Sequence, residues 1–344
     1  MIPAIEFDQV TFEYGAPTKR GLFGRAASRR ASAKAVDAAQ GPTSGVRDVS
    51  FAVHPGEFVA VIGNNGAGKT TLSKLANGLL KPQAGTVRVD GVPTTELRTS
   101  ALAARVGMLF QNPDRQICQS TVLEEIAFGL RLQGAERANE HAARVAEDFG
   151  LPADASPFAL SRGERQRLAL ASVMAGEPGV LILDEPTTGL DYRECTRIMT
   201  RVRELNHAGT AVIMVCHDME LVADFAQRVV VMANGRIVAD GAPEEVFRDH
   251  AALERASVMP PQMVELALRL EKSLGRTDDA SAEAFARVMD VRDMVTAVAS
   301  CACGVGAAAE VVAAAEAIVR GESPESEASA TKKCALAACA ERKA

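Results

Sequence analysis

A phosphate-binding pattern, G-x-x-x-x-G-K-[ST], occupies residues 63–70 as Gly63-Asn64-Asn65-Gly66-Ala67-Gly68-Lys69-Thr70. It follows the apolar run 58–62 and precedes a helical segment that we expect to begin near Thr70. This order of strand, glycine-rich turn and helix is the context that the motif requires. Glycines let the backbone curve closely around an anion, and the N–H groups at a helix start attract phosphate. The pattern predicts that the protein binds a nucleoside triphosphate, and it outweighs the alternative of a structural glycine-rich turn.

Lys69 and Thr70 supply the chemistry of this loop. A lysine at that position is a mobile positive charge for the β- and γ-phosphates, and the following hydroxyl is a ligand for Mg²⁺. We therefore expect ATP and Mg²⁺ as the bound species. The residues of this segment that we predict to bind the nucleotide are Gly63, Asn64, Asn65, Gly66, Ala67, Gly68, Lys69, Thr70 and Thr71.

A second apolar run, residues 180–183, ends in Asp184 and Glu185. Such a run is typical of a parallel strand that is covered on both faces, and charge at its C-terminal end emerges where doubly wound sheets bind ligands. Asp184 is placed to hold Mg²⁺, and Glu185 to polarise a water for attack on the γ-phosphate. Alone, the pair indicates a strand that ends in solvated acids. Together with the loop at 63–70, it favours a catalytic site.

The composition narrows the class of protein. The 344 residues are 47% hydrophobic and 24% charged, with a net charge of −6 and a mean hydropathy of +0.03. An acidic chain with few aromatic residues does not favour nucleic-acid binding. We find no apolar run long enough to span a bilayer and no signal peptide at the N-terminus. The seven cysteines lack an evident disulfide framework, which suits a reducing compartment. We expect a soluble, intracellular protein whose membrane role, if any, comes through a partner.

Between the two halves of the site lies the run 160–167, Leu-Ser-Arg-Gly-Glu-Arg-Gln-Arg. It resembles the LSGGQ signature of ABC-type ATPases. Further segments in the same order resemble other elements of that family: Tyr14 as the aromatic residue that stacks on adenine, Gln111 as the Q-loop, Gly189-Leu190-Asp191 as the D-loop, and His217 as the switch histidine. The resemblance covers about the first 250 residues.

The resemblance implies an α/β fold: a P-loop NTPase core with a mostly parallel sheet, an antiparallel β subdomain, a helical signature subdomain and an α-helical C-terminal extension. It also implies an ATP hydrolase. Lys69, Glu185, His217 and Gln111 are its expected catalytic residues, with Gln111 joining Thr70 and Asp184 at the metal. Each of three residues also has an alternative without a catalytic or binding role. Gln111 is then an ordinary loop residue and His217 a structural histidine. Tyr14, which alternates with Val10 and Phe12, is then an aromatic residue of the core.

The signature also has a meaning in local structure. Ser161-x-x-Glu164 before an apolar helix predicts a capping box, and that helix start is an anion site. In the family, this site closes on ATP that the opposite subunit holds, so Ser161 and Gly163 are expected to bind nucleotide in a two-chain site. The sequence departs from the family pattern at Arg162, in place of the first glycine, and at Glu164, in place of glutamine.

Within the family, the run Gln111-Asn112-Pro113-Asp114-Arg115-Gln116 resembles that of energy-coupling factor ATPases, which drive uptake of vitamins and nickel or cobalt. Segments 241–247 and 260–264 agree. This likeness implies an importer ATPase at the cytoplasmic face of the membrane. Its implied partners are a second ABC ATPase, identical or related, a transmembrane coupling subunit and a substrate-binding membrane subunit, with no nucleic acid. The alternatives are an ATPase of another ABC importer class and a soluble ABC ATPase that serves no transporter.

We expect an ATPase domain over 1–250, with a basic insertion at about 16–45 and the helical subdomain at about 112–175. The insertion is interpreted as a solvated loop, with attraction to anionic lipid as the alternative. A helical extension is expected over 251–320 and disorder over 321–344. Two apolar stripes are predicted in the extension, Met263, Leu266, Ala267, Leu270 and Leu274, and then Ala284, Val288, Val291, Val295 and Val298. The cysteines of this tail fit no common metal spacing.

Overall fold

Strand β3 (Phe58–Ile62) is buried along its whole length and lies in the middle of a six-stranded sheet. β-branched and apolar residues on both faces of a strand are typical of a parallel sheet that helices cover on both sides. The other parallel strands share this character. In sheet order the strands are β10 (Arg236–Gly241), β9 (Arg228–Ala233), β3, β8 (Ala211–Val215), β7 (Val180–Asp184) and β6 (Val106–Leu109). Only β10 runs antiparallel to its neighbour.

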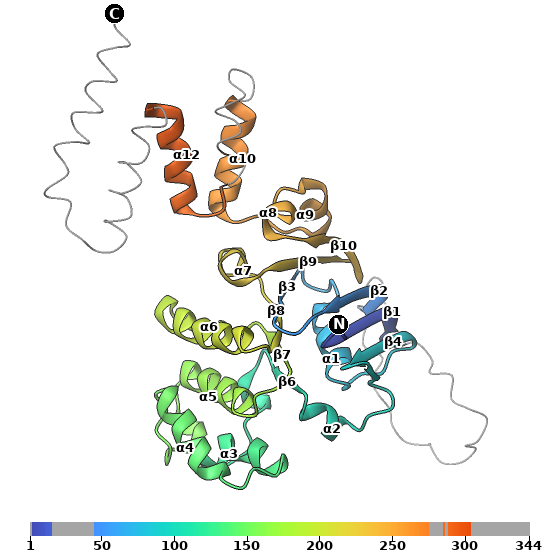
Figure 1. Cartoon of the computed structure of the whole chain (residues 1–344), viewed down its shortest axis with the longest axis vertical. Coiled ribbons are helices and arrows are strands. Elements are labelled where there is room, and N and C mark those ends of the chain that lie inside the picture. Colours follow the sequence, from blue (N-terminus) through green and yellow to red (C-terminus); the bar gives the residue numbers. More distant parts are fainter. Residues whose placement is uncertain (1, 16–44, 275–284, 286–287, 304–344) are drawn as a thin grey trace, which may run out of the picture. The chain divides into compact units, whose positions relative to one another are not determined.

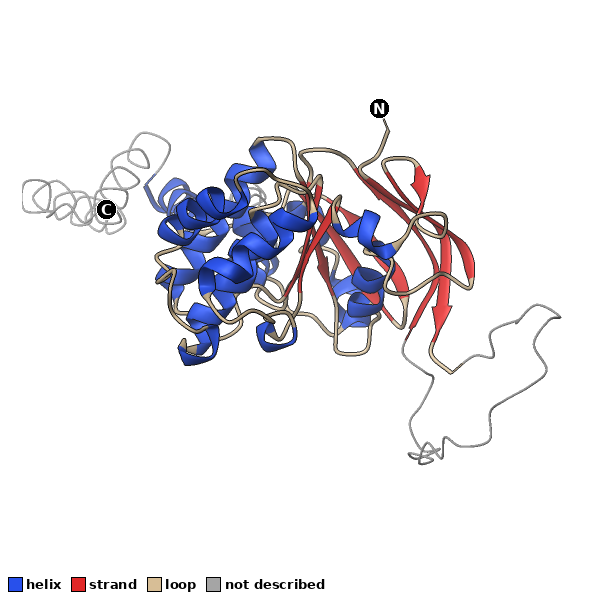
Figure 2. Ribbon diagram, turned by 90° about the horizontal axis from the view of Figure 1, so that it is seen from below, coloured by secondary structure: helices blue, strands red, loops and turns tan. Residues whose placement is uncertain are grey.

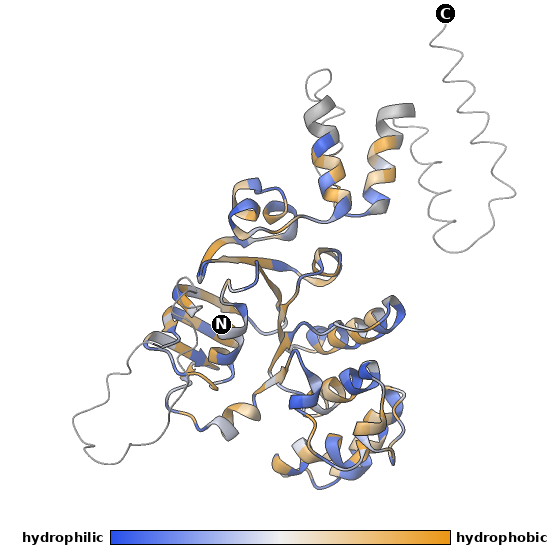
Figure 3. Cartoon of the chain, turned by 180° about the vertical axis from the view of Figure 1, so that it is seen from behind, coloured by the Kyte–Doolittle hydropathy of each residue, from blue (hydrophilic) through white to orange (hydrophobic). Residues whose placement is uncertain are grey.

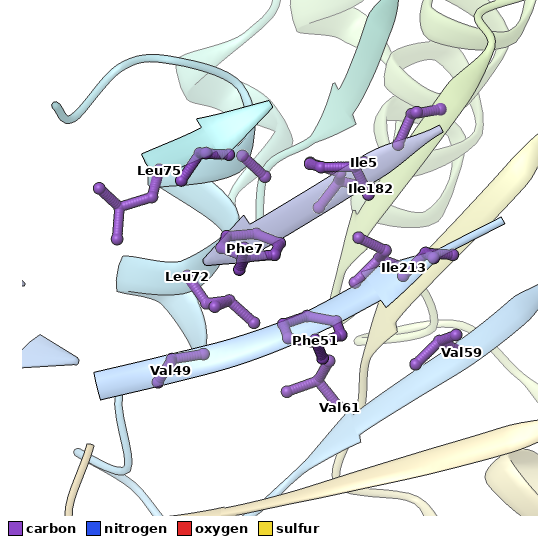
Figure 4. Close-up of a cluster of buried hydrophobic side chains, with 14 of the residues drawn as sticks. Ile5, Phe7, Val49, Phe51, Val59, Val61, Leu72, Leu75, Ile182 and Ile213 are labelled. Atoms are coloured by element: carbon purple, nitrogen blue, oxygen red, sulfur yellow. The ribbon is translucent and has the colours of Figure 1, made fainter. Parts of the chain in front are cut away.

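A second, antiparallel sheet has the order β2 (Gly45–Val53), β1 (Ile5–Glu13), β4 (Ala84–Val89) and β5 (Val92–Pro93). Its pairing of β1 with β2 shifts register between Phe7 and Val10 and again before Phe12. The two sheets and α1 (Lys69–Ala76) enclose one apolar core. In Figure 4, Phe7 and Phe51 face Leu72 of α1, and the two rings are stacked with centroids 4.7 Å apart.

The computed structural model describes residues 2–15, 45–274, 285 and 288–303 (Figure 1). The basic insertion, the final tail and Ala284 therefore lie outside the described residues. The described residues pack as two units, the first within 1–242 and 254–258, the second within 243–253 and 259–344. None of the helices within these ranges combines the length and the apolar character of a membrane-spanning segment. The predicted domain boundaries stay predictions.

The helices of the first unit flank the larger sheet. In Figure 1, α5 and α6 lie on one side of β7 and β8, and α1 lies on the other side, toward the antiparallel sheet. Figure 2 shows the same layering, with a helix between the two sets of strands, and in Figure 3 the central strands are apolar along their length. The remaining helices are α2 (Thr99–Ala103), α3 (Val122–Leu132), α4 (Ala138–Asp148), α5 (Arg162–Met174), α6 (Tyr192–His207) and α7 (Met219–Phe225), with short 3₁₀ turns η1 (Pro113–Arg115) and η2 (Pro157–Ala159). These elements match the predicted fold class.

The C-terminal segment contains α8 (Pro243–Val246), α9 (His250–Ala256), α10 (Gln262–Leu274) and α12 (Val291–Cys303). A small apolar cluster joins α10 to α12 through Ala267, Phe285, Val288, Met294 and Ala297, with Met263 packed against it. The predicted stripes are wrong in part. Leu266 is 43% exposed and Val298 47% exposed, because the buried arcs of these helices pass through Val264 and Ala267 on α10 and through Met294 and Ala297 on α12.

Candidate active site

The loop at 63–70 joins β3 to α1 and needs its glycines for two reasons. Gly63, Gly66 and Gly68 have φ angles of +148°, +85° and +104°, which side chains rarely tolerate. In addition, a Cβ at Gly63 would lie 2.2 Å from the Met232 carbonyl oxygen, and one at Gly68 would lie 2.5 Å from the Gly45 carbonyl oxygen. α1 begins directly after Gly68 without a side-chain cap, so its first N–H groups are free to meet an anion.

Lys69 lies across the mouth of this loop. Its Nζ donates to the carbonyl oxygens of Gly63, at 2.6 Å, and Asn64, at 2.9 Å. Only 7% of the residue is exposed, and burial lowers the pKa of the ammonium, while Glu185 and Asp184 act to raise it. A buried cation held by carbonyl oxygens and facing carboxylates is well placed to move onto phosphate oxygens.

Asp184 ends β7 and is 3% exposed. Burial, and next the charge of Glu185, raise the pKa of this carboxyl to about 6, against a hydrogen bond from the Thr70 side chain and the charge of Lys69. The Asp184 carboxylate and the Thr70 hydroxyl are hard oxygen donors, and the charges of Lys69 and Lys74 do not outweigh the effect of burial on the Asp184 pKa. This donor set fits Mg²⁺, which prefers oxygen ligands and one or two carboxylates.

Glu185 is where the predicted catalytic groups meet. Its Oε2 accepts from Gln111 Nε2 at 2.9 Å and from Thr188 Oγ1 at 3.3 Å, and its Oε1 lies 3.3 Å from His217 Nε2. The residue has a φ of +54°, and its N–H donates to the Val215 carbonyl oxygen at 2.9 Å. A strained backbone that neighbouring strands hold in place is common at reactive residues.

His217 faces this carboxylate as a neutral imidazole. Burial and then the Lys69 charge lower its pKa below the ordinary value of 6.5, while the Glu185 charge opposes them. At neutral pH the ring therefore carries one N–H and one free nitrogen lone pair. That state lets His217 hold Glu185 without adding positive charge.

A cavity of about 310 Å³ collects most of the predicted residues. It is lined by Tyr14, Asn65, Gly66, Gly68, Lys69, Thr70, Thr71, Lys74, Gln111, Asp184, Glu185, Val215 and His217. Gly63, Asn64 and Ala67 are not part of its lining, and the first two instead hold Lys69. Ser161 and Gly163 also lie outside this lining, and their contact with a nucleotide stays a prediction.

Tyr14 follows β1 directly and is 38% exposed. Its ring packs edge-to-face against the Phe12 ring, with the two centroids 5.1 Å apart. The alternative in which it fills a core face is wrong, because Tyr14 lies beyond the last residue of β1 and is exposed. An exposed aromatic residue on the cavity wall suits stacking on a base. Contact with adenine stays a prediction.

The capping box at the start of α5 is confirmed. Ser161 Oγ accepts from the Glu164 N–H at 3.3 Å, and Glu164 Oε2 accepts from the Ser161 N–H at 2.8 Å. Glutamate thus keeps the capping role at a position where the family signature has glutamine. The buried Gln166 then fastens the helix to the segment after Glu185, because its Nε2 donates to the Pro186 carbonyl oxygen at 3.1 Å.

Sequence reasoning missed three side chains. Thr188 contacts Glu185 directly, and Lys74 lines the cavity one helical turn after Thr70. Gln116 accepts from the Phe110 N–H at 3.4 Å and donates to the Ala169 carbonyl oxygen at 3.3 Å, so it joins the end of β6 to α5. Lys74 carried a sequence signal, its i+4 spacing from Thr70. Nothing in the sequence marks the contact between Gln116 and Ala169.

The raised pKa of Asp184 predicts a stability effect. Its folded pKa of about 6 exceeds the unfolded value of 3.8, so the carboxyl favours folding fully below pH 3.8 and loses that contribution as the pH rises through 6. We expect Asp184→Asn to raise the unfolding free energy of the nucleotide-free, metal-free chain by about 2 kcal/mol at pH 7.5. Urea unfolding at pH 5 and pH 7.5 checks this. The gain should shrink at pH 5, and an equal effect at both pH values would contradict it.

The sheet order, the glycine loop and the carboxylates at the end of β7 are those of a P-loop nucleotide-binding cassette. Comparison with known proteins agrees. Residues 46–188 match the family model described as ABC transporter. An energy-coupling factor transporter ATP-binding protein EcfA of Methanothermobacter thermautotrophicus is 40% identical over 66% of this chain and 75% of its own length. An EcfA2 protein of Caldanaerobacter subterraneus is 38% identical over 67% of this chain and 83% of its own length.

The chain belongs to the ABC transporter ATP-binding proteins and, among them, to the energy-coupling factor family. Solved structures agree on the fold. CbiO1 of Clostridium perfringens, described as part of the ABC transporter complex cbiONQ, is 26% identical with a TM-score of 0.59 and covers 80% of this chain and 97% of its own. Other relatives are longer. The chain spans only 37–41% of the length of three ABC transporter ATP-binding proteins that are 42–45% identical to it.

Proposed function

We propose that this chain is the ATP-binding and ATP-hydrolysing subunit of an energy-coupling factor importer that takes up a vitamin or a transition-metal ion. The convergence of Gln111, Thr188 and His217 on Glu185, next to Asp184 and the phosphate loop, carries the proposal. A loop that only bound a nucleotide has no need of such a half-buried carboxylate on a strained backbone.

In this proposal the loop N–H groups and Lys69 bind the β- and γ-phosphates. Thr70, Asp184 and Gln111 hold Mg²⁺, which supplies charge neutralisation at the phosphates. Glu185 orients and polarises the attacking water, and Gln111, Thr188 and His217 fix its carboxylate.

The signature at Ser161 and Gly163 acts on the nucleotide of a second ATPase cassette, either identical or related. ATP then joins the two cassettes, since its phosphates are shared between one chain's loop and the helix start of the other. Loss of the γ-phosphate removes these shared contacts and opens the pair. The description of CbiO1 as part of an ABC transporter complex supports membrane partners for this chain. The partners that we propose are a coupling subunit and a substrate-binding subunit. Association with them would place the chain at the cytoplasmic face of the membrane.

Purification of the tagged full chain from its own membranes, in mild detergent, tests this function. We expect a transmembrane coupling subunit and a small hydrophobic substrate-binding subunit to co-purify, and the assembly to hydrolyse ATP. The Glu185→Gln chain, prepared in parallel, should bring down the same partners without turnover. Recovery of cytosolic proteins alone would overturn the importer assignment.

A further inference from the structure

A second cavity, of about 640 Å³, adjoins the nucleotide cavity. The two share Thr70, Lys74, Gln111 and Asp184, which are the residues around the expected γ-phosphate. The second cavity continues from there past the turn η1 to the first turn of α5. It therefore begins at the residues to which the proposed function assigns the γ-phosphate and extends from them to α5.

Positive charge dominates this cavity. Its lining contains Lys74, Arg115, Arg162 and Arg165, against the carboxylates of Asp114 and Asp184. Arg165 is occupied, because its Nε pairs with Asp114 Oδ1 at 2.7 Å. Among the described residues, the side chains of the other three cations form no hydrogen bond or ion pair. The Lys74 charge acts on the Asp184 carboxylate, which leaves Arg115 and Arg162 as the cations of the lining with no such partner among the described residues. Cations of this kind attract an anion into a cavity.

The side chain of Arg162 packs against Gly189, in the segment that resembles the D-loop. A Cβ at Gly189 would lie 3.3 Å from Arg162 Nε and 3.4 Å from its Cδ, so the arginine stem lies directly against the Gly189 backbone. Gly189 has a φ of +84°, which also disfavours a side chain there. Arg162 stands where the family signature has glycine. Arginine at this position thus adds a guanidinium to the cavity, and Gly189 leaves room for its side chain.

We propose that this cavity binds the inorganic phosphate released by hydrolysis, through Arg115, Arg162 and Lys74, before it leaves the protein. The proposal rests on the proposed ATPase activity. The product is a tetrahedral dianion that cannot leave through the space that ADP still fills. Guanidinium groups match phosphate oxygens in geometry as well as in charge. Occupancy of this site should delay release of phosphate and make phosphate an inhibitor of turnover.

Binding of inorganic phosphate to the full chain loaded with ADP and Mg²⁺, measured by titration calorimetry, tests the site. We expect saturable binding, weakened about fivefold by Arg115→Gln and about fivefold by Arg162→Gln, the effect of one partly exposed charge pair each. ADP affinity should change less than twofold in both variants. Arg98→Gln is the matched control, because Arg98 is an exposed arginine outside both cavities.

Two results would overturn the site. One is the absence of phosphate binding to the ADP-loaded chain, and the other is an equal loss of affinity in the Arg98→Gln control. These experiments distinguish failure of the phosphate site from failure of the proposed ATPase function. A chain that binds phosphate through Arg115 and Arg162 but never hydrolyses ATP keeps the anion site and loses the ATPase assignment. Turnover with no phosphate binding overturns the site alone.

Discussion

Replacing Glu185 by glutamine should lower ATP turnover by at least about a hundredfold while ATP affinity stays within a few-fold of that of the unmodified chain. Glutamine keeps the shape of the side chain and an oxygen that accepts from Gln111 and Thr188, which lie 2.9 and 3.3 Å from Glu185 Oε2. It cannot accept a proton from water. Phosphate release and nucleotide binding, measured on the same preparation, check the prediction.

The Glu185→Gln experiment needs a control for the loss of a carboxylate. Glu177→Gln serves, because Glu177 is exposed and lines neither cavity. It should leave turnover unchanged. Residual hydrolysis above a tenth of the normal rate in Glu185→Gln would remove Glu185 from the water-activating role.

The second large effect is expected from Lys69→Ala. Its ammonium is the buried cation of the loop, bound to the carbonyl oxygens of Gly63 and Asn64. Without it, the β- and γ-phosphates lose a charge-assisted contact, and ATP affinity should fall about 10- to 100-fold. Fluorescent nucleotide binding with Mg²⁺ measures this, with Arg98→Ala as the control for general charge loss. Unchanged ATP affinity in Lys69→Ala would contradict the assignment of the loop.

Much of this site could be predicted from sequence because its parts are local. The strand at 58–62, the glycine loop and the capping box at Ser161 and Glu164 are each short runs whose residues determine the backbone. The position of Asp184 could also be predicted locally, because the last residue of a buried parallel strand lies at the edge of the sheet where ligands bind. These features follow from periodicity, glycine and capping chemistry alone.

The contacts that join distant segments do not follow from local residue patterns, and only the family resemblance implied that Gln111, Glu185 and His217 share one site. Gln111 and Glu185 are 74 positions apart, and their hydrogen bond depends on β6 pairing with β7. The strained φ of Glu185 also depends on its neighbours, through the bond to Val215. In the C-terminal helices, spacing alone was right for Ala267 and Val288 but wrong for Leu266 and Val298. Leu266 looked like a stripe residue, but packing against Phe285 and Met294 selects the adjacent face of α10.

In the proposed function, each ATP lies between the phosphate loop of one cassette and the signature of another. Native mass spectrometry of the Glu185→Gln assembly, purified from membranes and supplied with ATP and Mg²⁺, tests it most directly. We predict two ATPase cassettes and two ATP molecules in each assembly, and loss of the pairing when Ser161 is also replaced by arginine. A single cassette that stays fully loaded with ATP, with no second ATPase present, would contradict the account.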